Sequence, residues 1–521
     1  MGTIVQRWTA VEIAETLGWQ LGGRLDDMLP LGPAQIDTRA ISAPGFDPDG
    51  DQGIRVDAPI FVALQGPGGH GANFWAQAVA RGAGALLFGS DADDELLYEV
   101  MADAAVPVLV ADTDGWTALG DLANAWRRRC DFTVVGITGS TGKTSTKDML
   151  ATLLAPVRRT HASPANHNNE LGVPLTLLAA TPGTDVVICE MGMRGRRQVE
   201  YLCDVAEPDV GVLTNVGSAH LELLGSRDAI AAAKAEIIAG TRPSGIAVVP
   251  AGQPGLLDLA ERVPQQVLTF GSVDGPAPDV DAAADVLVET VERTVAGIAG
   301  SLRIGATVHS FSLPIHGLHN AANLAAAVAV AWAIVGDEGL AQLDFEPGSM
   351  ALSLGRGQRT GLADGGVVID DAYNASPESV SAALAELAVI TVPGSRIAVL
   401  GYMAELGADE IELHITAGEH VAAAGIDQLV AVTSNAATSA LVLRWEELTG
   451  QQAITFDSVE AAIASLDTWA SASDAILVKA SNSAGLGRCT EALVERYVLR
   501  ASASSLLDST IITTTERGDT A

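Results

Sequence analysis

Residues 136–146 read Gly-Ile-Thr-Gly-Ser-Thr-Gly-Lys-Thr-Ser-Thr and lie between a β-branched run, 133–135, and a helix-like segment, 147–154. Strand, glycine-rich turn and helix in this order are the context that a phosphate-binding loop requires. Backbone N–H groups of the turn and of the helix N-terminus would face a polyphosphate. Lys143 would place its charge on the outer phosphates, and Thr144 would offer Mg²⁺ a hydroxyl ligand. The expected nucleotide-binding residues of this loop are Gly139, Ser140, Thr141, Gly142, Lys143, Thr144 and Ser145.

The loop departs from the general Walker spacing, because Ile137 stands where that pattern has its first glycine. What remains is the shorter form Gly-x-x-Gly-Lys-Thr-Ser. A glycine turn that merely opens an ordinary α/β helix is the alternative, but Gly-Lys-Thr-Ser between a strand and a helix is hard to produce by accident. The loop therefore predicts that the chain binds a nucleoside triphosphate.

Two further polar side chains come directly after apolar strands. Glu190 closes the strand 186–189, and the carboxyl ends of parallel strands are where such sheets place ligands. A carboxylate at that position is a natural Mg²⁺ ligand beside the phosphates, although a solvated acid at a strand end is the alternative. His220 follows the strand 210–213 at another carboxyl end. Taken by itself, such a histidine is more often a hydrogen-bonded structural residue than a ligand.

The other polar candidates are weaker on composition alone. The loop 166–174 contains Asn168 and Asn169, whose amides are able to bind a carboxylate or peptide group, but a structural turn fits the composition better. Lys234 lies on a helix of small residues and is most simply a surface lysine. Asn320 and Asn323 lie three apart on one helical face, as contacts to an adenine would need. Helix N-capping by Asn320 is the alternative.

The composition bounds the class of protein. A length of 521 residues suggests about three domains. The formal net charge of −34 argues against nonspecific nucleic-acid binding and against docking on anionic lipid, since both need a basic surface. The four cysteines lack metal-ligand spacing. No stretch resembles a signal peptide or approaches the ~20 apolar residues of a membrane span, so we expect a cytoplasmic protein with no span.

Apolar strands and helices alternate along three blocks, and this alternation predicts an α/β fold with parallel sheets covered on both faces. Residues 1–112 are expected to form a small α/β domain and 113–345 a central P-loop parallel-sheet domain. Residues 346–505 would form a Rossmann-like domain, after a hinge near residue 345. The third block has no Gly-x-Gly-x-x-Gly after its first strand, so no dinucleotide site is expected there. Residues 506–521 are expected to form a disordered tail.

The ordered set of motifs resembles the Mur ligases, the ATP-dependent amino-acid and peptide ligases of peptidoglycan synthesis, a family that also includes folylpolyglutamate synthase. The resemblance covers roughly residues 37–487 and all three blocks. It rests on the phosphate loop, on the loop 166–174, on Glu190, His220 and Lys234, and on the segments 317–323 and 371–377.

The resemblance implies roles for these residues. Two Mg²⁺ sites are implied, one held by Thr144 and Glu190 and one by His220, and the family's lysine at the position of Lys234 is carbamylated by CO₂ to support the metals. Lys143, His220 and Lys234 would thus be the catalytic residues. Asn320 and Asn323 would contact the adenine region of ATP, and Arg356, Asp371 and Asn374 would reach the nucleotide from the third domain. The implied substrate-binding residues are Thr38, Arg39, His70, Asn168, Asn169 and Arg194.

The resemblance also implies the reaction. A substrate carboxylate would attack ATP to give an acyl phosphate, and an amine would then displace the phosphate. UDP-N-acetylmuramoyl-tripeptide and D-alanyl-D-alanine are the implied substrates, and a monomer is expected. A Mur-type ligase with another acceptor is one alternative, because Tyr402, Ala480 and Asn482 depart from the family's usual residues. A P-loop switch or kinase and a catalytically silent nucleotide binder are the others.

Overall fold

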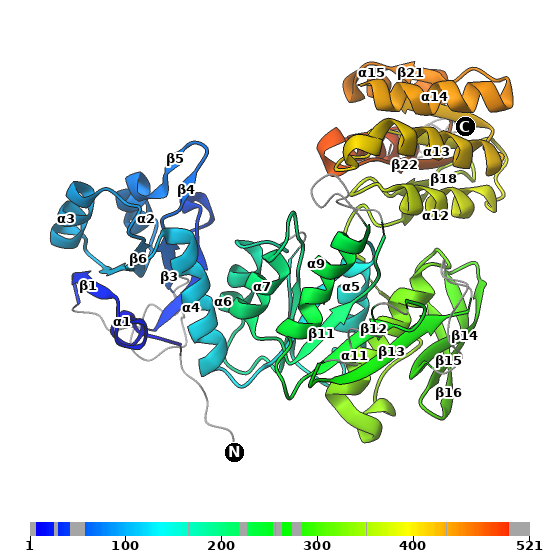
Figure 1. Ribbon diagram of the computed structural model, residues 1–521. Helices are drawn as coiled ribbons and strands as arrows, with labels where there is room; N and C mark the ends of the chain where they lie inside the picture. Colours follow the sequence, from blue (N-terminus) through cyan, green and yellow to red (C-terminus); the bar gives the residue numbers. More distant parts are fainter. Residues whose placement is uncertain are drawn as a thin grey trace, which may run out of the picture.

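The structure is a computed structural model with three α/β domains in a row, two of them built on large sheets (Figure 1). It describes residues 7–25, 30–41, 58–164, 167–217, 227–253, 256, 263–273, 284–350, 352–433 and 435–499. His220 and the tail 506–521 lie outside these described residues, so the predictions made for them stay predictions. The predicted fold class, α/β with a central parallel sheet, is confirmed.

The amino-terminal domain is built on a five-stranded sheet with the order β1-β7-β6-β3-β2. The pairs β2–β3, β3–β6 and β6–β7 are parallel, and β1 is antiparallel to β7. The strands are β1 (Gln20–Gly23), β2 (Leu31–Gln35), β3 (Ala58–Val62), β6 (Ala85–Phe88) and β7 (Pro107–Val110), with a small hairpin of β4 (Gln65–Gly66) and β5 (Gly69–His70). The helices are α1 (Ala10–Leu17), α2 (Trp75–Ala80) and α3 (Asp94–Asp103), with short 3₁₀ turns η1 (Thr38–Ala40) and η2 (Gly71–Phe74).

The central domain holds a nine-stranded sheet with the order β16-β15-β14-β13-β12-β11-β8-β10-β9. Its strands are β8 (Thr133–Thr138), β9 (Thr160–Ala162), β10 (Val186–Glu190), β11 (Val210–Leu213), β12 (Ile246–Pro250), β13 (Gln266–Ser272), β14 (Val286–Arg293), β15 (Ile298–Ile304) and β16 (Thr307–Leu313). Strand β8 lies between β10 and β11, parallel to both, so the chain crosses over on either side of it. An antiparallel extension of the sheet begins at β14, whereas β13 still pairs in parallel with both neighbours.

Helices cover both faces of this sheet. They are α4 (Gly115–Arg129), α5 (Lys143–Leu154), α6 (Gly172–Ala179), α7 (Gln198–Ala206), α9 (Arg227–Gly240) and α11 (Asn320–Leu340). Helix α5 starts at Lys143, earlier than the predicted start at residue 147, because the phosphate loop runs straight into it. In the described part of the chain, α11 alone is long and apolar enough to cross a membrane; just over half of its most apolar stretch is buried, as in a helix of a protein core.

The carboxyl-terminal domain has a six-stranded sheet with the order β17-β18-β22-β19-β20-β21, parallel except for the pair β17–β18. Its strands are β17 (Gln358–Gly361), β18 (Val367–Asp370), β19 (Arg396–Leu400), β20 (Gln428–Val432), β21 (Ile454–Phe456) and β22 (Ala475–Lys479). Its helices are α12 (Pro377–Ala388), α13 (Glu410–Ala423), α14 (Ala436–Thr449), α15 (Val459–Ala464), α16 (Leu466–Trp469) and α17 (Gly487–Val494), with η3 (Gly407–Asp409), η4 (Asn482–Ala484) and a last turn, Glu495–Leu499.

The apolar cores cross one of the expected domain boundaries and not the other. One continuous cluster joins Ile13 and Leu87 of the amino-terminal domain, through Leu122 of α4, to Val187 under one face of the central sheet. A second cluster fills the other central face beneath α5 and α11. The carboxyl-terminal sheet has its own cluster on each face, with no member before Leu362. The boundaries at 112 and 345 themselves remain predictions.

Candidate nucleotide site between the central and carboxyl-terminal domains

The predicted phosphate loop joins β8 to α5 at the carboxyl end of the parallel sheet. Gly142 precedes the first residue of α5 and has φ +81°, a conformation that favours glycine. A Cβ there would lie 2.2 Å from Oδ1 of Asn323, and a Cβ at Gly139 would lie 1.9 Å from Oγ1 of Thr214. Any side chain at these two positions would clash with its neighbours, so the loop requires both glycines and is more than a generic turn.

The loop that follows β11 braces the phosphate loop. Thr214 donates from Oγ1 to the carbonyl of Thr141 at 2.6 Å. Asn215 accepts the Thr141 N–H at 2.9 Å and donates from Nδ2 to Thr141 Oγ1 at 2.5 Å. Ser140 Oγ accepts the N–H of Gly217 at 2.8 Å. Thr214 and Asn215 were absent from the predicted site, although their position after an apolar strand was the signal that could have found them.

Thr144 and Glu190 meet, as the sequence predicted for a shared ligand. Thr144 donates from Oγ1 to Oε2 of Glu190 at 2.8 Å, and both side chains are buried. Asn168 donates from Nδ2 to the other carboxylate oxygen at 3.0 Å. The described residues hold no group of three or more His, Cys, Asp and Glu side chains suited to a metal. A hydroxyl and one carboxylate are nevertheless an oxygen set that suits Mg²⁺, which takes its remaining ligands from phosphates and water.

Two lysines lie behind this corner, and burial lowers the pKa of both. Lys143 donates from Nζ to the carbonyl of Gly139 at 2.7 Å, and burial lowers its pKa although Glu190 opposes the shift. Lys234 of α9 is only 1% exposed. Burial, and then the nearby charge of Lys143, bring the pKa of Lys234 well below its ordinary value of 10.5. The interpretation of Lys234 as a surface lysine is therefore wrong.

Helix α11 presents its first turn to the phosphate loop. Asn320 is buried and donates from Nδ2 to the carbonyl of His316 at 2.8 Å. Asn323 donates from Nδ2 to Oδ1 of Asn320 at 3.0 Å, which places the Asn323 side chain against Gly142. N-capping by Asn320, the alternative role, is wrong, because Asn320 is the first residue inside the helix and His319 precedes it.

The carboxyl-terminal domain reaches the loop through Arg356. Its Nη2 donates to Thr144 Oγ1 at 3.0 Å, and its guanidinium lies 4.1 Å from the centre of the Tyr373 ring. Asp371 accepts a hydrogen bond from Nζ of the buried Lys479 at 2.6 Å, and the same ammonium donates to the carbonyl of Asn374 at 2.9 Å. Lys479 was absent from the predicted site, although a lysine that ends an apolar strand could have marked it.

The predicted substrate residues of the amino-terminal domain lie away from this corner. Thr38 is buried and donates from Oγ1 to Gln77 Oε1 at 2.6 Å. Arg39 pairs with Asp37 at 2.6 Å, and this hydrogen bond lowers the pKa of the Asp37 carboxyl to about 2. His70 accepts a backbone N–H through Nδ1 at the start of η2.

The other two predicted substrate residues, Asn169 and Arg194, hydrogen-bond within their own segments rather than to the Thr144–Glu190 corner. Asn169 accepts the N–H groups of Leu171 and Gly172, so its side chain orders the start of α6. The N–H of Arg194 donates to Gln198, and the side chain of Arg194 is exposed. Among the described residues of this loop, 167–174, only Asn168 hydrogen-bonds to the Thr144–Glu190 corner.

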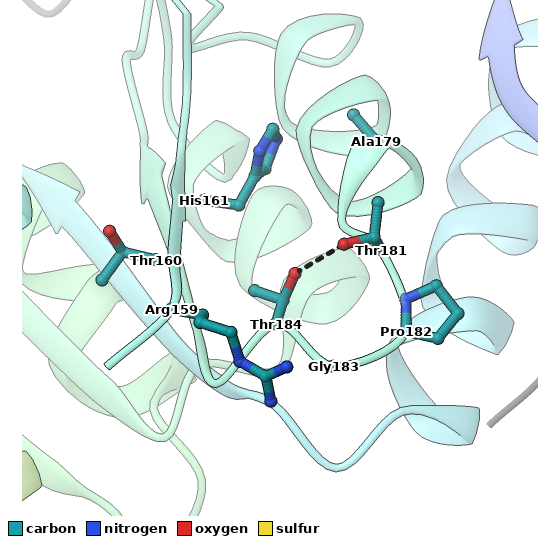
Figure 2. A pocket seen from close by; sticks show the side chains of 8 residues that line it. All are labelled: Arg159, Thr160, His161, Ala179, Thr181, Pro182, Gly183 and Thr184. Carbon is teal, nitrogen blue, oxygen red and sulfur yellow. Dashed lines mark hydrogen bonds between the residues drawn. The ribbon is translucent and has the colours of Figure 1, made fainter. Parts of the chain in front are cut away.

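A separate surface pocket opens at the other end of the same strands (Figure 2). Thr160 of β9 pairs with Val186, the first residue of β10, whereas Glu190 is the last residue of β10. The pocket therefore lies at the amino ends of these strands, and the phosphate loop lies at the carboxyl edge of the sheet. Its lining holds none of the predicted site residues and consists of Arg159, Thr160, His161, Ala179, Thr181, Pro182, Gly183 and Thr184.

Comparisons with known proteins place this geometry in a family. Two family models match the chain, the Mur ligase middle domain over residues 137–331 and the Mur ligase, glutamate ligase domain over residues 355–482. The chain is 35% identical to the UDP-N-acetylmuramoyl-tripeptide–D-alanyl-D-alanine ligase of Synechocystis sp., over 84% of this chain and 90% of that protein.

Two solved structures share the whole architecture. A crystal structure of MurF from Acinetobacter baumannii aligns with a TM-score of 0.77 at 26% identity, covering 95% of this chain and 100% of that one. The MurF ligase of Thermotoga maritima in complex with ADP aligns with a TM-score of 0.70 at 25% identity, covering 88% and 96%. With both family domains matched and a relative aligned over most of its length, the chain belongs to the Mur ligase family.

Proposed function

We propose that this ATP-dependent, ADP-forming Mur ligase joins D-alanyl-D-alanine to UDP-N-acetylmuramoyl-tripeptide in the synthesis of peptidoglycan precursors. The observation that carries the proposal is the corner where Thr144 contacts Glu190 and Arg356 beside the phosphate loop. The name of the Synechocystis relative supports this acceptor over another. A P-loop switch or kinase would not need a third domain that reaches the loop, and a silent binder would not need a buried Lys234.

The chain's own residues suit a two-step transfer. In the first step a carboxylate oxygen of the tripeptide attacks the γ-phosphorus of ATP, and ADP leaves with the electrons of the broken P–O bond. Two anions must approach each other, so Lys143, Arg356 and the N-terminus of α5 favour this step by neutralising charge. In the second step the neutral amine of D-alanyl-D-alanine attacks the acyl carbon. Phosphate leaves, and the nitrogen gives up a proton.

Mg²⁺ fits the Thr144–Glu190 corner, and Asn168 would hold the carboxylate in place as its hydrogen-bonded neighbour. When bound, the ion would neutralise the β- and γ-phosphates. A second Mg²⁺ held by His220 is proposed from the family resemblance. The adenine end of ATP is assigned to Asn320 and Asn323, which are hydrogen-bonded to each other, with Asn323 against Gly142 of the phosphate loop.

We infer that Lys234 is carbamylated by CO₂. Carbamylation requires a neutral amine, and the burial that lowers the pKa of Lys234 supplies one. The product is a carboxylate in place of a cation, and it would support the metal site. Among the described residues, no hydrogen bond or ion pair joins the Lys234 ammonium, so the side chain keeps its capacity for a new partner.

The substrate is proposed to extend from the amino-terminal domain to the phosphate loop. Thr38, Arg39 and His70 would bind the UDP end, and Asn168, Asn169 and Arg194 the peptide end. The acceptor would lie against the carboxyl-terminal domain, where Tyr402 stacks on His414 with ring centres 5.6 Å apart. Ala480 is buried, 3.0 Å from the place of a Cβ on Gly401, so the alanine is accommodated because residue 401 is glycine. Asn482 begins the short turn η4.

The test measures ATP-dependent phosphate release with UDP-N-acetylmuramoyl-tripeptide, in the presence and absence of D-alanyl-D-alanine. Mass spectrometry identifies the product. Tripeptides ending in diaminopimelate and in lysine are compared in parallel. We expect phosphate release that needs both substrates and yields the pentapeptide. Release with other acceptors only would overturn the acceptor assignment and leave the nucleotide site standing. We further infer that the protein is cytoplasmic and monomeric. Light scattering after gel filtration checks that it is a monomer.

A further inference from the structure

A single buried carboxylate, that of Glu386, joins the central and carboxyl-terminal domains. Glu386 lies in α12 and is only 7% exposed. Its Oε1 accepts from Nε and Nη2 of Arg293, at 3.0 Å and 2.7 Å, and from the N–H of Leu318 at 3.4 Å. Its Oε2 accepts from Nη2 of Arg359 at 3.2 Å. Two of these donor residues belong to the central domain and one to the carboxyl-terminal domain.

The donors lie next to elements that carry the nucleotide site. Arg293 is the last residue of β14, and Figure 1 shows α12 above the end of this antiparallel extension. Leu318 comes two residues before α11, whose first turn holds Asn323 against the phosphate loop. Arg359 lies in β17, three residues after Arg356. The position of Glu386 relative to Arg293 is therefore tied to the position of Arg356 relative to Thr144.

The balance of charges makes this contact sensitive to domain position. A buried carboxylate needs its full set of partners, because an unpaired buried charge is costly. If the domains separate, Glu386 keeps Arg359 but loses both Arg293 hydrogen bonds and the Leu318 N–H. Water would replace these partners only after the interface opens. The contact therefore favours one orientation of the two domains, and the domains can still separate from it.

We propose that Glu386 is a positioning residue which, through Arg293, holds the carboxyl-terminal domain in the orientation that brings Arg356 to Thr144. Among the described residues, Glu386 accepts hydrogen bonds from Arg293, Leu318 and Arg359 and from no residue of the phosphate loop, so it would act on the site only through the placement of the domain. The kinetic part of this inference rests on the proposed ligase reaction, whereas its conformational part does not.

The conformational test measures the distance between the two domains by double electron–electron resonance. Spin labels are attached after Val308→Cys in β16 and Leu443→Cys in α14, both of which are exposed. The native cysteines, Cys130, Cys189, Cys203 and Cys489, are buried and stay unlabelled. We expect a single narrow distance distribution for this labelled background and a broader one after Arg293→Gln. Arg293→Lys, which keeps the charge, is expected to restore most of the narrow population.

The matched control breaks an ion pair that does not bridge the domains. Arg488→Gln removes the exposed pair with Glu460, 2.6 Å long and within the carboxyl-terminal domain, and should leave the distribution unchanged. A distribution that is already broad in the labelled background, or one that Arg293→Gln does not alter, would overturn the proposal. Because the labels report without substrate, this result stands apart from any failure of the proposed reaction.

The kinetic test separates positioning from simple loss of structure. If Arg293→Gln leaves roughly a tenth of the molecules in the competent orientation, the apparent KM for ATP rises about tenfold, while saturating ligand restores the orientation and kcat stays within about twofold. Glu386→Gln should behave in the same way. A lower kcat at unchanged KM would mean fewer folded molecules and would contradict positioning. Absence of turnover in the wild type would refute the proposed function and leave the distance measurement valid.

Discussion

Arg356 donates a hydrogen bond to Thr144 across 212 residues of sequence, and the hydroxyl that receives it also donates to Glu190. One oxygen thus connects α5, β10 and the carboxyl-terminal domain. Because the guanidinium also lies over the Tyr373 ring, 4.1 Å from its centre, its position is set by two partners. The geometry makes the loop sensitive to the position of a domain that is distant in sequence.

Arg356→Lys should lower kcat roughly tenfold or more. A lysine keeps the charge but loses the planar stacking on Tyr373 and the fixed direction of the donor, and these properties are not interchangeable. Steady-state phosphate release measures the effect. Arg444→Lys, at an ion pair with Glu419 in the same domain, is the control and should leave kcat unchanged. Equal rates for the two variants would refute a role for Arg356 in the site.

Asn168→Ala should raise the Mg²⁺ concentration needed for half-maximal activity, by about ten- to a hundredfold, because the amide orients the Glu190 carboxylate as an outer-shell partner. Glu190→Gln should raise it further, since a direct oxygen ligand loses its charge. The measurement is phosphate release against MgCl₂ at saturating ATP. If both variants keep the wild-type Mg²⁺ dependence, Glu190 is not a ligand of the ion.

Gly142→Ala should abolish measurable ATP binding. The alanine would be forced into a left-handed backbone conformation, at a cost of about 1–2 kcal/mol, and its Cβ would overlap Asn323. Adding Asn323→Ala removes the overlap but not the backbone cost, so the double variant should recover only part of the affinity. Calorimetric titration with ADP measures both. Gly361→Ala, where a Cβ meets nothing within 4 Å, serves as the neutral control.

Lys234→Met should change how stability depends on pH. The folded-state pKa of Lys234 lies below its ordinary 10.5, so between these two values the unfolded chain binds more protons than the folded one, and wild-type stability rises with pH. The rise, relative to Lys234→Met, should approach about 1.4 kcal/mol per pH unit within that window. Urea unfolding in bicarbonate-free buffer, between about pH 7 and 9, measures it. Parallel profiles for the two proteins would show that Lys234 titrates as an ordinary lysine.

Local patterns in the sequence predicted much of the fold. Strand β11 was predicted over 210–213, the bounds that the structure has, and β10 over 186–189, one residue short, because each is a continuous apolar run followed by polar residues. The phosphate loop was predicted because its chemistry depends on adjacent residues. The Thr144–Glu190 contact followed from the rule that parallel strands end at one edge of a sheet.

The rest depends on contacts between segments that are far apart in sequence. The sequence predicted a surface position for Lys234, because a helix of small residues has no contrast between its faces; the packing of α9 buries the side chain. Glu386 is a charged residue whose sequence pattern in α12 does not indicate burial. Its partner, Arg293, comes from another domain. Asn169 could not be separated from Asn168 by composition, and only their hydrogen bonds distinguish them, since Asn169 accepts from the backbone of its own loop and Asn168 donates to Glu190.

The apolar cluster that runs from Ile13 to Val187 has a consequence for how the molecule unfolds. Because this core is shared, the amino-terminal and central domains should melt together, whereas the carboxyl-terminal domain, with clusters of its own, should melt separately. Scanning calorimetry should show two transitions. Leu122→Ala should lower the free energy of unfolding of the first unit and Leu477→Ala that of the second, each by about 2–5 kcal/mol. A weakened amino-terminal domain would then destabilise the phosphate loop through the shared core, without any contact to the nucleotide.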